Sequence, residues 1–274
     1  MTPSIVSGTS ASSEMLAAEY FRMADVEAEM WWYTSLHLHL VETIRKFFGE
    51  NKQIRILDAG CGTGGFLRYL QRQGYANSIG LDISDIAVEF SRRQGFDVNK
   101  GSIADAAVLK RIGKVDVIVS MDVICSLPSE EQRVVFFREA ERLLNDDGLM
   151  IIQTPAFASL GGIHDMAVGV NKRYTKSEIR DVLRQADIAH YNLGYRLMVL
   201  TPVIFMVRAM QRMRLKLGKD VAIESDVKMP SRIVNTLLFL LQRMEDRWLL
   251  FRPFGTSLQI LISKGDVDNE VRTK

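Results

Sequence analysis

The stretch that decides the fold reads Ile54-Arg-Ile-Leu-Asp58-Ala-Gly60-Cys-Gly62-Thr-Gly64-Gly65. Its apolar run ends at Asp58, a glycine-rich turn follows, and Phe66–Gln73 continues as a predicted helix. Glycine lets the backbone turn sharply and approach a ligand, and the next helix points its free N–H groups at the same place. The stretch therefore predicts a strand, a ligand-binding loop and a helix.

Further strands and helices alternate along the chain on both sides of this unit. The other predicted strands are Ser78–Leu81, Phe96–Asn99, Val115–Ser120, Leu149–Thr154, Ile188–Leu193 and Ser257–Ser263. Predicted helices include Ser84–Gln94, Ser129–Leu144 and Thr175–Gln185, the last beginning with a capping box of Thr175 and Glu178. This alternation predicts an α/β fold, a Rossmann-like doubly wound sheet of seven strands.

The two ends of the chain and one internal block extend this core. Residues 1–50 are expected to form a disordered tail, Met1–Ser13, followed by two lid helices. The core is predicted over 51–195 and 253–264, and 196–252 is predicted to be a helical cap inserted before the last strand. A long loop at Ala156–Asn171 is expected to be functional.

Composition narrows the class of protein. The 274 residues carry a formal net charge of +2, which gives no reason to expect a nucleic-acid partner. Two cysteines fit a reducing compartment, and the longest apolar run is too short to cross a bilayer. We therefore expect a cytoplasmic protein; its oligomeric state is not predicted.

Two acids beside the glycines indicate the kind of ligand. Gly60, Gly62 and Gly65 also fit the dinucleotide fingerprint, so a nicotinamide-dependent oxidoreductase is an alternative. Asp58, however, would repel a pyrophosphate and would suit a ligand with an amino group and a sulfonium centre. Asp82 ends the second strand, where a carboxylate can accept hydrogen bonds from the ribose of any adenosine ligand.

The motif order resembles that of class I S-adenosylmethionine-dependent methyltransferases. Motif I corresponds to Ile56–Gly64, the acidic ribose position to Gly80–Ser84, the fourth-strand motif to Val115–Val123, and the turn into the fifth strand to Leu143–Ile151. The resemblance covers roughly Ile54–Thr154. It implies S-adenosylmethionine as the cofactor and an antiparallel last strand.

Specific residues follow from this resemblance. The predicted cofactor-binding residues are Asp58, Gly60, Cys61, Gly62, Asp82, Ile83, Ser102, Ile103 and Met121. Two positions depart from the family pattern. Gly101-Ser102 stands where an acid usually lies near adenine, and Ile124-Cys125-Ser126 stands where Leu-Glu-His is common.

Residues outside the core resemble a group of bacterial small-molecule methyltransferases, with ubiquinone-type O-methyltransferases as the nearest general likeness. These predicted substrate and lid residues are Trp31, Trp32, Tyr33, Asp165, Arg173 and Tyr174. His164 lies in the loop after the fifth strand, where its imidazole could accept a proton during methyl transfer. The alternative for His164 is a histidine on a surface loop without a catalytic role. The alternative for the three aromatic residues is that their helix simply packs on the sheet.

The segment Arg196–Lys219 combines methionines and basic residues without an acid. Met206 and Met210 are predicted to line a pocket for a small apolar or amphiphilic acceptor. Ordinary packing within the cap and peripheral contact of 196–219 with a membrane are the alternatives.

The pattern predicts no metal, since His37 and His39 point to different faces of a helix and no acid cluster appears. The predicted function is methyl transfer to a hydroxyl of a small molecule, with an amine or a carbon acceptor as the less favoured alternatives. The alternatives are the oxidoreductase and a non-catalytic protein that binds a nucleoside or a membrane surface.

Overall fold

The structure is a computed structural model that describes residues 15–216, 225 and 227–264. The tail expected at Met1–Ser13 and the basic Lys219 lie outside the described residues. The strands are β1 (Ile56–Ala59), β2 (Ser78–Asp82), β3 (Val98–Lys100), β4 (Val115–Met121), β5 (Leu144–Pro155), β6 (Tyr191–Arg196) and β7 (Ser257–Ser263).

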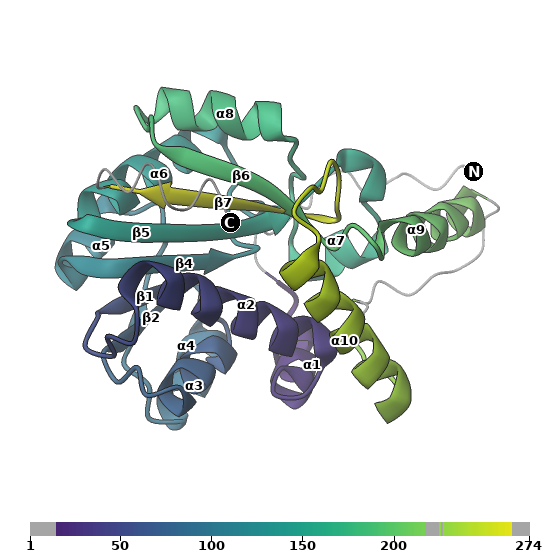
Figure 1. The fold of residues 1–274 in the computed structure, drawn as a ribbon, viewed down its shortest axis with the longest axis horizontal. Helices are drawn as coiled ribbons and strands as arrows, with labels where there is room; N and C mark the ends of the chain where they lie inside the picture. Colours follow the sequence, from purple (N-terminus) through teal and green to yellow (C-terminus); the bar gives the residue numbers. More distant parts are fainter. Residues whose placement is uncertain (1–14, 217–224, 226, 265–274) are drawn as a thin grey trace, which may run out of the picture.

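The strands form one sheet in the order β3-β2-β1-β4-β5-β7-β6. Strands β1 to β5 pair in parallel, whereas β7 is antiparallel to both β5 and β6. The predicted seven-stranded sheet with an antiparallel last strand is therefore confirmed. The carboxyl ends of the parallel strands and the start of β7 meet along one edge of the sheet, on the right in Figure 1.

Helices cover both faces of the sheet (Figure 1). One layer holds α2 (Trp31–Phe48), α3 (Gly65–Arg72) and α4 (Asp85–Arg93), and the other holds α5 (Ala106–Ile112), α6 (Glu130–Leu143) and α8 (Lys176–Gln185). The predicted capping box of α8 is present, with Thr175 and Glu178 satisfying each other's backbone. Burial of apolar side chains between sheet and helices supplies most of the driving force for this layering.

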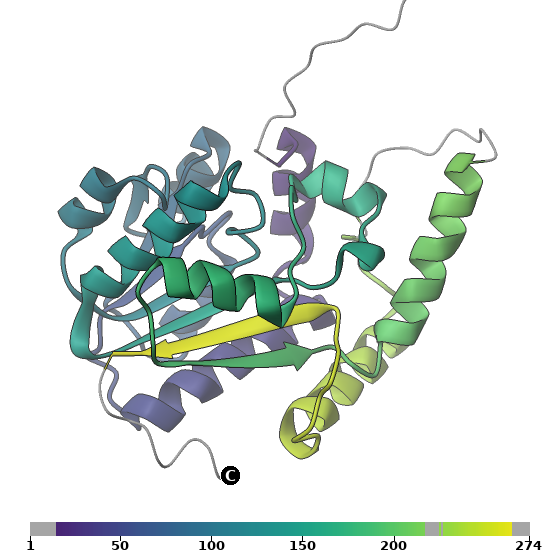
Figure 2. The same ribbon diagram turned by 90° about the horizontal axis from the view of Figure 1, so that it is seen from above.

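The remaining elements lie around the carboxyl edge of the sheet. They are α1 (Ala17–Val26), the short 3-10 helix η1 (Ala158–Leu160), α7 (Ile163–Val168), α9 (Thr201–Lys216) and α10 (Arg232–Trp248). Both α9 and α10 are helices outside the sheet, and the two diverge from it in Figures 1 and 2. The segment expected to be a loop at Ala156–Asn171 contains the two short helices η1 and α7. Helix α5 was not predicted from the sequence.

No helix among the described residues is long and apolar enough to cross a membrane.

Candidate active site

The glycine loop connects β1 to α3 at the carboxyl edge. Gly60 and Cys61 donate backbone hydrogen bonds to the Leu81 carbonyl on β2, which ties the turn to the neighbouring strand. Gly60 has φ of +93°, and a Cβ there would lie 2.1 Å from Cγ2 of Val123. Only glycine fits this position, because both the backbone conformation and the available space exclude a side chain.

Asp82 organises the same loop from the end of β2. Its carboxylate accepts hydrogen bonds from the backbone N–H groups of Gly62, at 2.8 Å, and Ser84, at 2.9 Å. Ile83, next to it, exposes an apolar side chain. An acid and an apolar surface therefore lie side by side at the end of β2, as an adenosine would require.

Asp58 lies fully buried in β1. Neither of its carboxylate oxygens has a hydrogen-bond partner among the described residues. Burial, with the negative charges of Asp82 and Glu27 nearby, raises the pKa of Asp58 to about 8. A buried carboxyl group without a partner is costly, so a cationic ligand that reached this point would relieve the cost.

A third acid reaches the loop from α1. Glu27 accepts a hydrogen bond from the Thr63 hydroxyl at 2.8 Å and lies 3.5 Å from the Arg68 guanidinium. Burial nevertheless raises the pKa of Glu27 to about 7. On the same helix, the methyl of Met23 lies 2.7 Å from the point where a Cβ of Gly62 would stand. Helix α1 therefore covers the glycine loop.

Asp122 follows β4 and was not singled out from the sequence. Its backbone has φ of +56°, unusual for a residue other than glycine, and its Oδ1 atom is buried without a partner among the described residues. Burial raises the pKa of Asp122 to about 7, although the Arg173 guanidinium opposes the shift. A positive φ at the end of a parallel strand could not be foreseen from the sequence.

The aromatic group at the start of α2 occupies several positions. The Trp31 backbone N–H bonds to Asn235 on α10 at 2.8 Å, whereas Trp32 packs on the core beside β4 and β5. The Trp32 and Tyr33 rings meet edge to face at 4.8 Å between centroids. Burial and the charges of Glu27 and Asp122 raise the pKa of the Tyr33 phenol. Tyr33 is thus the member of this group that faces the acids.

Four carboxyl groups and one phenol lie around the carboxyl ends of β1, β2 and β4, and we call them the acidic strip: Asp82, Asp58, Glu27, Tyr33 and Asp122. The negative charges of Asp82 and Glu27 contribute to the raised pKa of Asp58, and those of Glu27 and Asp122 contribute to the raised pKa of Tyr33. A ligand with positive charge at one end and a ribose at the other suits such a strip.

Residues of α7 and of the loop after it lie beyond Asp122, the last member of the acidic strip. His164 lies on α7 and is partly buried. Beside it, Asp165 and Arg173 form a two-pronged ion pair with both N···O distances at 2.7 Å. Tyr174 is fully buried in the core, and its hydroxyl has no hydrogen-bond partner among the described residues. Its predicted substrate role stays a prediction.

The other predicted cofactor residues differ in exposure. Cys61 is buried with Leu67 and Val98, Ile103 is buried in the core, and Ser102 and Met121 are partly exposed at the ends of β3 and β4. Ser102 accepts a backbone hydrogen bond from Ala104 at 3.1 Å.

Met206 and Met210, predicted to line the acceptor pocket, are about half exposed on α9, with relative accessibilities of 56% and 50%. The predicted role of these two methionines in lining an acceptor pocket stays a prediction.

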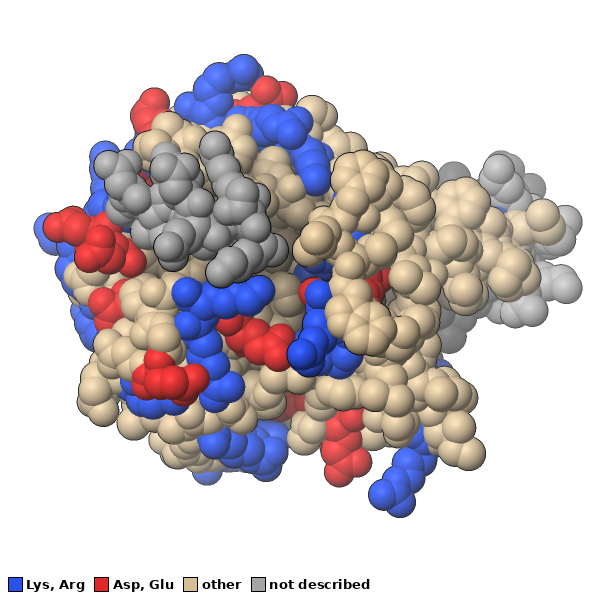
Figure 3. All heavy atoms as spheres, in the orientation of Figure 1, with Lys and Arg blue, Asp and Glu red and all other residues tan. Residues whose placement is uncertain are grey.

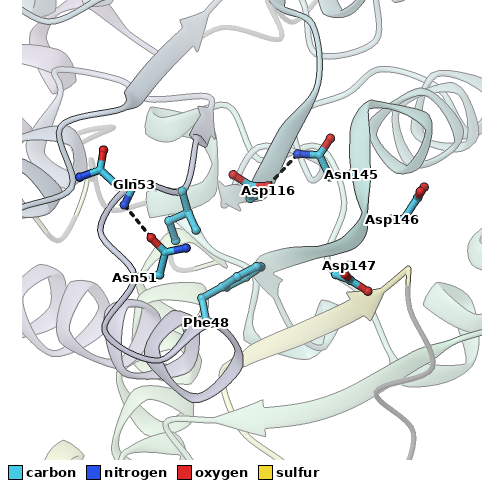
Figure 4. Close-up of a pocket in the computed structure, with 8 residues that line it drawn as sticks. Phe48, Asn51, Gln53, Asp116, Asn145, Asp146 and Asp147 are labelled. Carbon is cyan, nitrogen blue, oxygen red and sulfur yellow. Dashed lines mark hydrogen bonds between the residues drawn. The ribbon is translucent and has the colours of Figure 1, made fainter.

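A hollow among the described residues lies at the amino edge of the sheet (Figure 4). It has a volume of about 360 Å³, and Phe48, Asp116 and Asn145 are among its lining residues. Both oxygens of Asp116 are already bonded, at 2.7 Å, to the Arg55 backbone and the Asn145 side chain. Ligands of open α/β sheets bind at the opposite edge, so we assign no role in catalysis to this hollow.

Comparison with known proteins identifies the class. Residues 33–193 match the family model described as a methyltransferase domain, and the chain belongs to that family. It is a class I methyltransferase, and its cofactor is S-adenosylmethionine. No curated protein matches the sequence significantly.

Solved structures share the fold. A SAM-dependent methyltransferase from Archaeoglobus fulgidus is 19% identical, with a TM-score of 0.52 over 84% of this chain and 93% of that one. One from Thermotoga maritima is 16% identical, with a TM-score of 0.50 over 91% and 100%. The plantazolicin methyltransferase BamL, solved with a substrate analogue and SAH, is 14% identical, with a TM-score of 0.56 over 93% and 96%.

The residues at the carboxyl edge fit this cofactor. Asp58 would hold the positively charged methionine part, the glycine loop would approach it closely, and Asp82 would hold the ribose beside Ile83. Among the described residues, no group of three or more His, Cys, Asp or Glu is arranged to hold a metal ion.

Proposed function

We propose that this methyltransferase acts on a hydroxyl group of a small apolar or amphiphilic molecule, as ubiquinone-type O-methyltransferases do. The observation that carries the proposal is the acidic strip, which ends at Asp122 beside α7 and the Asp165–Arg173 pair. An acceptor placed there would lie close to α7, the helix that carries Asp165 and His164. An amine acceptor is the second candidate, since the same acids would attract an ammonium group.

The chemistry is a displacement in which the acceptor oxygen attacks an electrophilic methyl carbon, the methyl–sulfur bond breaks, and the hydroxyl proton passes to a base. The bound cofactor supplies that methyl group on a cationic sulfur. The chain's own contribution is to align the acceptor and to receive the proton. We propose His164 as the base, because an imidazole titrates near neutral pH.

Asp122 is a second candidate for the base. Its carboxyl group has a buried oxygen without a partner, and its raised pKa of about 7 suits proton transfer near neutrality. The Asp165–Arg173 pair holds the loop after β5 and supplies a fixed positive charge beside Asp122. In this proposal the pair has a positioning role, and the predicted contact of Asp165 and Arg173 with substrate is indirect.

The experiment measures methyl transfer from S-adenosylmethionine to a panel of phenols, catechols and aliphatic amines, with products identified by mass spectrometry. His164→Ala is expected to lower turnover by roughly 10²–10⁴-fold with little change in affinity for S-adenosylhomocysteine. His190→Ala, at an exposed histidine before β6, is the matched control.

Two outcomes would change the assignment. Turnover of His164→Ala within about threefold of the wild type would remove the base role, and a large loss in Asp122→Asn would transfer it there. Methylation of the amines alone would replace the hydroxyl acceptor with the second candidate. The proposal also assigns the enzyme to the cytoplasm, in keeping with its two buried free cysteines.

A further inference from the structure

The two helices of the cap, α9 and α10, turn their polar sides to the protein body and their apolar sides to solvent, the reverse of the usual arrangement. In a soluble protein a surface helix normally turns its apolar side to the core and its polar side to water. Here the polar sides of α9 and α10 bond to the body of the enzyme, and the apolar sides face outward.

Helix α10 shows the reversal most clearly. Four of its polar residues form the inner side: Asn235 bonds the start of α2, Arg243 pairs with Glu42 at 2.7 and 2.8 Å, Asp246 pairs with Arg196, and Gln242 bonds Asp246. On the opposite side, Ile233, Leu237, Leu240, Met244 and Trp248 follow one another at helical spacing and are all exposed. The exposed fractions of Ile233 and Trp248 are 75% and 69%.

Helix α9 repeats the arrangement. Arg212 donates hydrogen bonds to the carbonyls of Ser159 and Gly161, and Arg208 is buried beside Gly162. The other side of the helix carries Val203, Met206, Val207, Met210 and Met213, all exposed. The segment after α10 adds Leu250 and Phe251, which are 84% and 78% exposed.

We call these exposed residues of α9, α10 and the following segment the cap face. Basic residues predominate in these two helices: α9 holds Arg208, Arg212, Arg214 and Lys216 and no acid, and α10 begins at Arg232 and has its two acids, Glu245 and Asp246, on the buried side. Figure 3 shows the end of the molecule that bears these helices as mostly uncharged surface, in contrast to the opposite end.

We propose that the cap face docks on the surface of an anionic phospholipid bilayer. Exposed apolar sides on two helices mark an interaction surface, and the excess of Lys and Arg over exposed acids in these helices is complementary to anionic headgroups. The exposed apolar side chains belong to two helices that diverge in Figures 1 and 2, an arrangement that suits insertion among lipid chains. Because no described helix can span the membrane, the contact would be peripheral.

The position of the cap face gives this contact a use. Arg212 of α9 holds the η1 turn, which leads directly into α7 and His164. A bilayer at the cap face would therefore lie close to the entrance for an apolar acceptor. This use rests on the proposed function, whereas the docking itself does not.

The test is flotation of the full chain, without cofactor or acceptor, with two kinds of vesicle. Neutral vesicles contain phosphatidylcholine alone, and anionic vesicles contain roughly 30–40% phosphatidylglycerol as well. The wild type should float with the anionic vesicles and at least tenfold less with the neutral ones, and 0.5 M salt should weaken binding (about the range that screens headgroup charge). Ile233→Glu with Leu237→Glu should abolish binding, and circular dichroism should show an unchanged fold because both residues are exposed.

The matched control adds the same two charges away from the cap face, as Gln71→Glu on α3 and Asn192→Asp on β6, both at exposed positions. This variant should bind the anionic vesicles like the wild type. Equal flotation of the wild type and the cap-face variant, or no flotation of the wild type, would overturn the proposal. A stable dimer by light scattering that Ile233→Glu and Leu237→Glu dissociate would also overturn it, since a second copy would then cover the face. Flotation needs no turnover, so it can succeed while the proposed acceptor fails.

Discussion

Asp58 shows how a single residue can cost stability and serve binding. Its buried carboxyl group has a raised pKa of about 8 against an ordinary value of 3.8. The folded state therefore binds a proton more tightly than the unfolded state, and Asp58 destabilises the fold increasingly as the pH rises from about 4 to about 8. A cationic ligand that binds beside Asp58 would offset this cost.

We expect Asp58→Asn to raise the stability of the ligand-free protein. The gain should be present at pH 5.5 and larger by about 3 kcal/mol at pH 8.5, because over this range the folded wild type holds a proton that the unfolded chain has already lost. The same variant should bind S-adenosylmethionine roughly 10–100-fold more weakly, since a charge-assisted contact is lost. Urea unfolding at the two pH values and calorimetry measure these effects. A loss of stability at pH 8.5 would contradict the argument.

Gly60 permits a second prediction at the residue scale. Gly60→Ala should lower stability by about 2–4 kcal/mol, since it combines a left-handed backbone with a close approach to Val123. Gly95→Ala is the control, because Gly95 has φ of +88° with nothing within 4 Å, so only the backbone term of about 1 kcal/mol applies. Adding Val123→Ala to Gly60→Ala should recover part of the loss. Equal effects of Gly60→Ala and Gly95→Ala would show that the space beside Val123 is not limiting.

At the scale of elements, α10 depends on a buried ion pair. Arg196 at the end of β6 and Asp246 on α10 pair at 2.7 Å with both side chains almost fully buried. Arg196 also bonds Gln153 at 3.0 Å, and the positive charges of Arg196 and Arg252 hold the pKa of Asp246 below its usual range despite its burial. The pair therefore fastens the cap to the carboxyl edge of the sheet.

We expect Asp246→Ala to destabilise the protein by about 3–5 kcal/mol, because it leaves the Arg196 charge buried without its partner. Asp181→Ala removes the exposed pair with Arg184 and should cost less than 1 kcal/mol (roughly). Denaturant unfolding compares the two. Similar small losses would mean that the cap is held by other contacts, such as the Arg243–Glu42 pair.

The elements that the sequence predicted best are those with strong local signals. The apolar run of β7 and the capping box of α8 occur at the predicted residues, since both depend on neighbouring positions in the chain. By contrast, β6 begins at Tyr191, three residues later than expected, because its register is set by pairing with β7. The reversed faces of α9 and α10 were also not predicted, because helical periodicity does not tell which side meets the body.

The candidate site divides in the same way. The glycines, Asp58 and Asp82 follow from motif spacing at strand ends. Asp122 and Glu27 join them only through tertiary structure, one through an unusual backbone conformation and the other through the docking of α1. Sequence reasoning therefore named the residues of the glycine loop and the ends of β1 and β2, but not the two acids that tertiary structure brings beside them.

At the scale of the whole molecule, the binding of a cofactor should stabilise the entire fold, because α1, the glycine loop and β4 meet at one edge of the sheet. Backbone and side-chain bonds extend this closure: Leu16 bonds Ala167 of α7, and Ser225 bonds Glu19 of α1. A ligand that fills the acidic strip would add contacts to all these elements together.

We therefore predict that S-adenosylhomocysteine at about 100 times its dissociation constant adds roughly 2–3 kcal/mol of stability, measured as a shift in the melting temperature. NAD at the same concentration should add nothing, because its pyrophosphate would approach Asp58, which shares a buried site with Asp82 and Glu27.

S-adenosylmethionine carries an additional positive charge on sulfur, so its binding should ionise Asp58 and release a proton, which calorimetry in buffers of different ionisation enthalpy detects. Its advantage over S-adenosylhomocysteine should grow with pH up to about 8, where Asp58 becomes charged without assistance. Stabilisation by NAD equal to that by S-adenosylhomocysteine would contradict this account of the strip. An advantage that stays constant with pH would show that Asp58 does not sense the sulfonium charge.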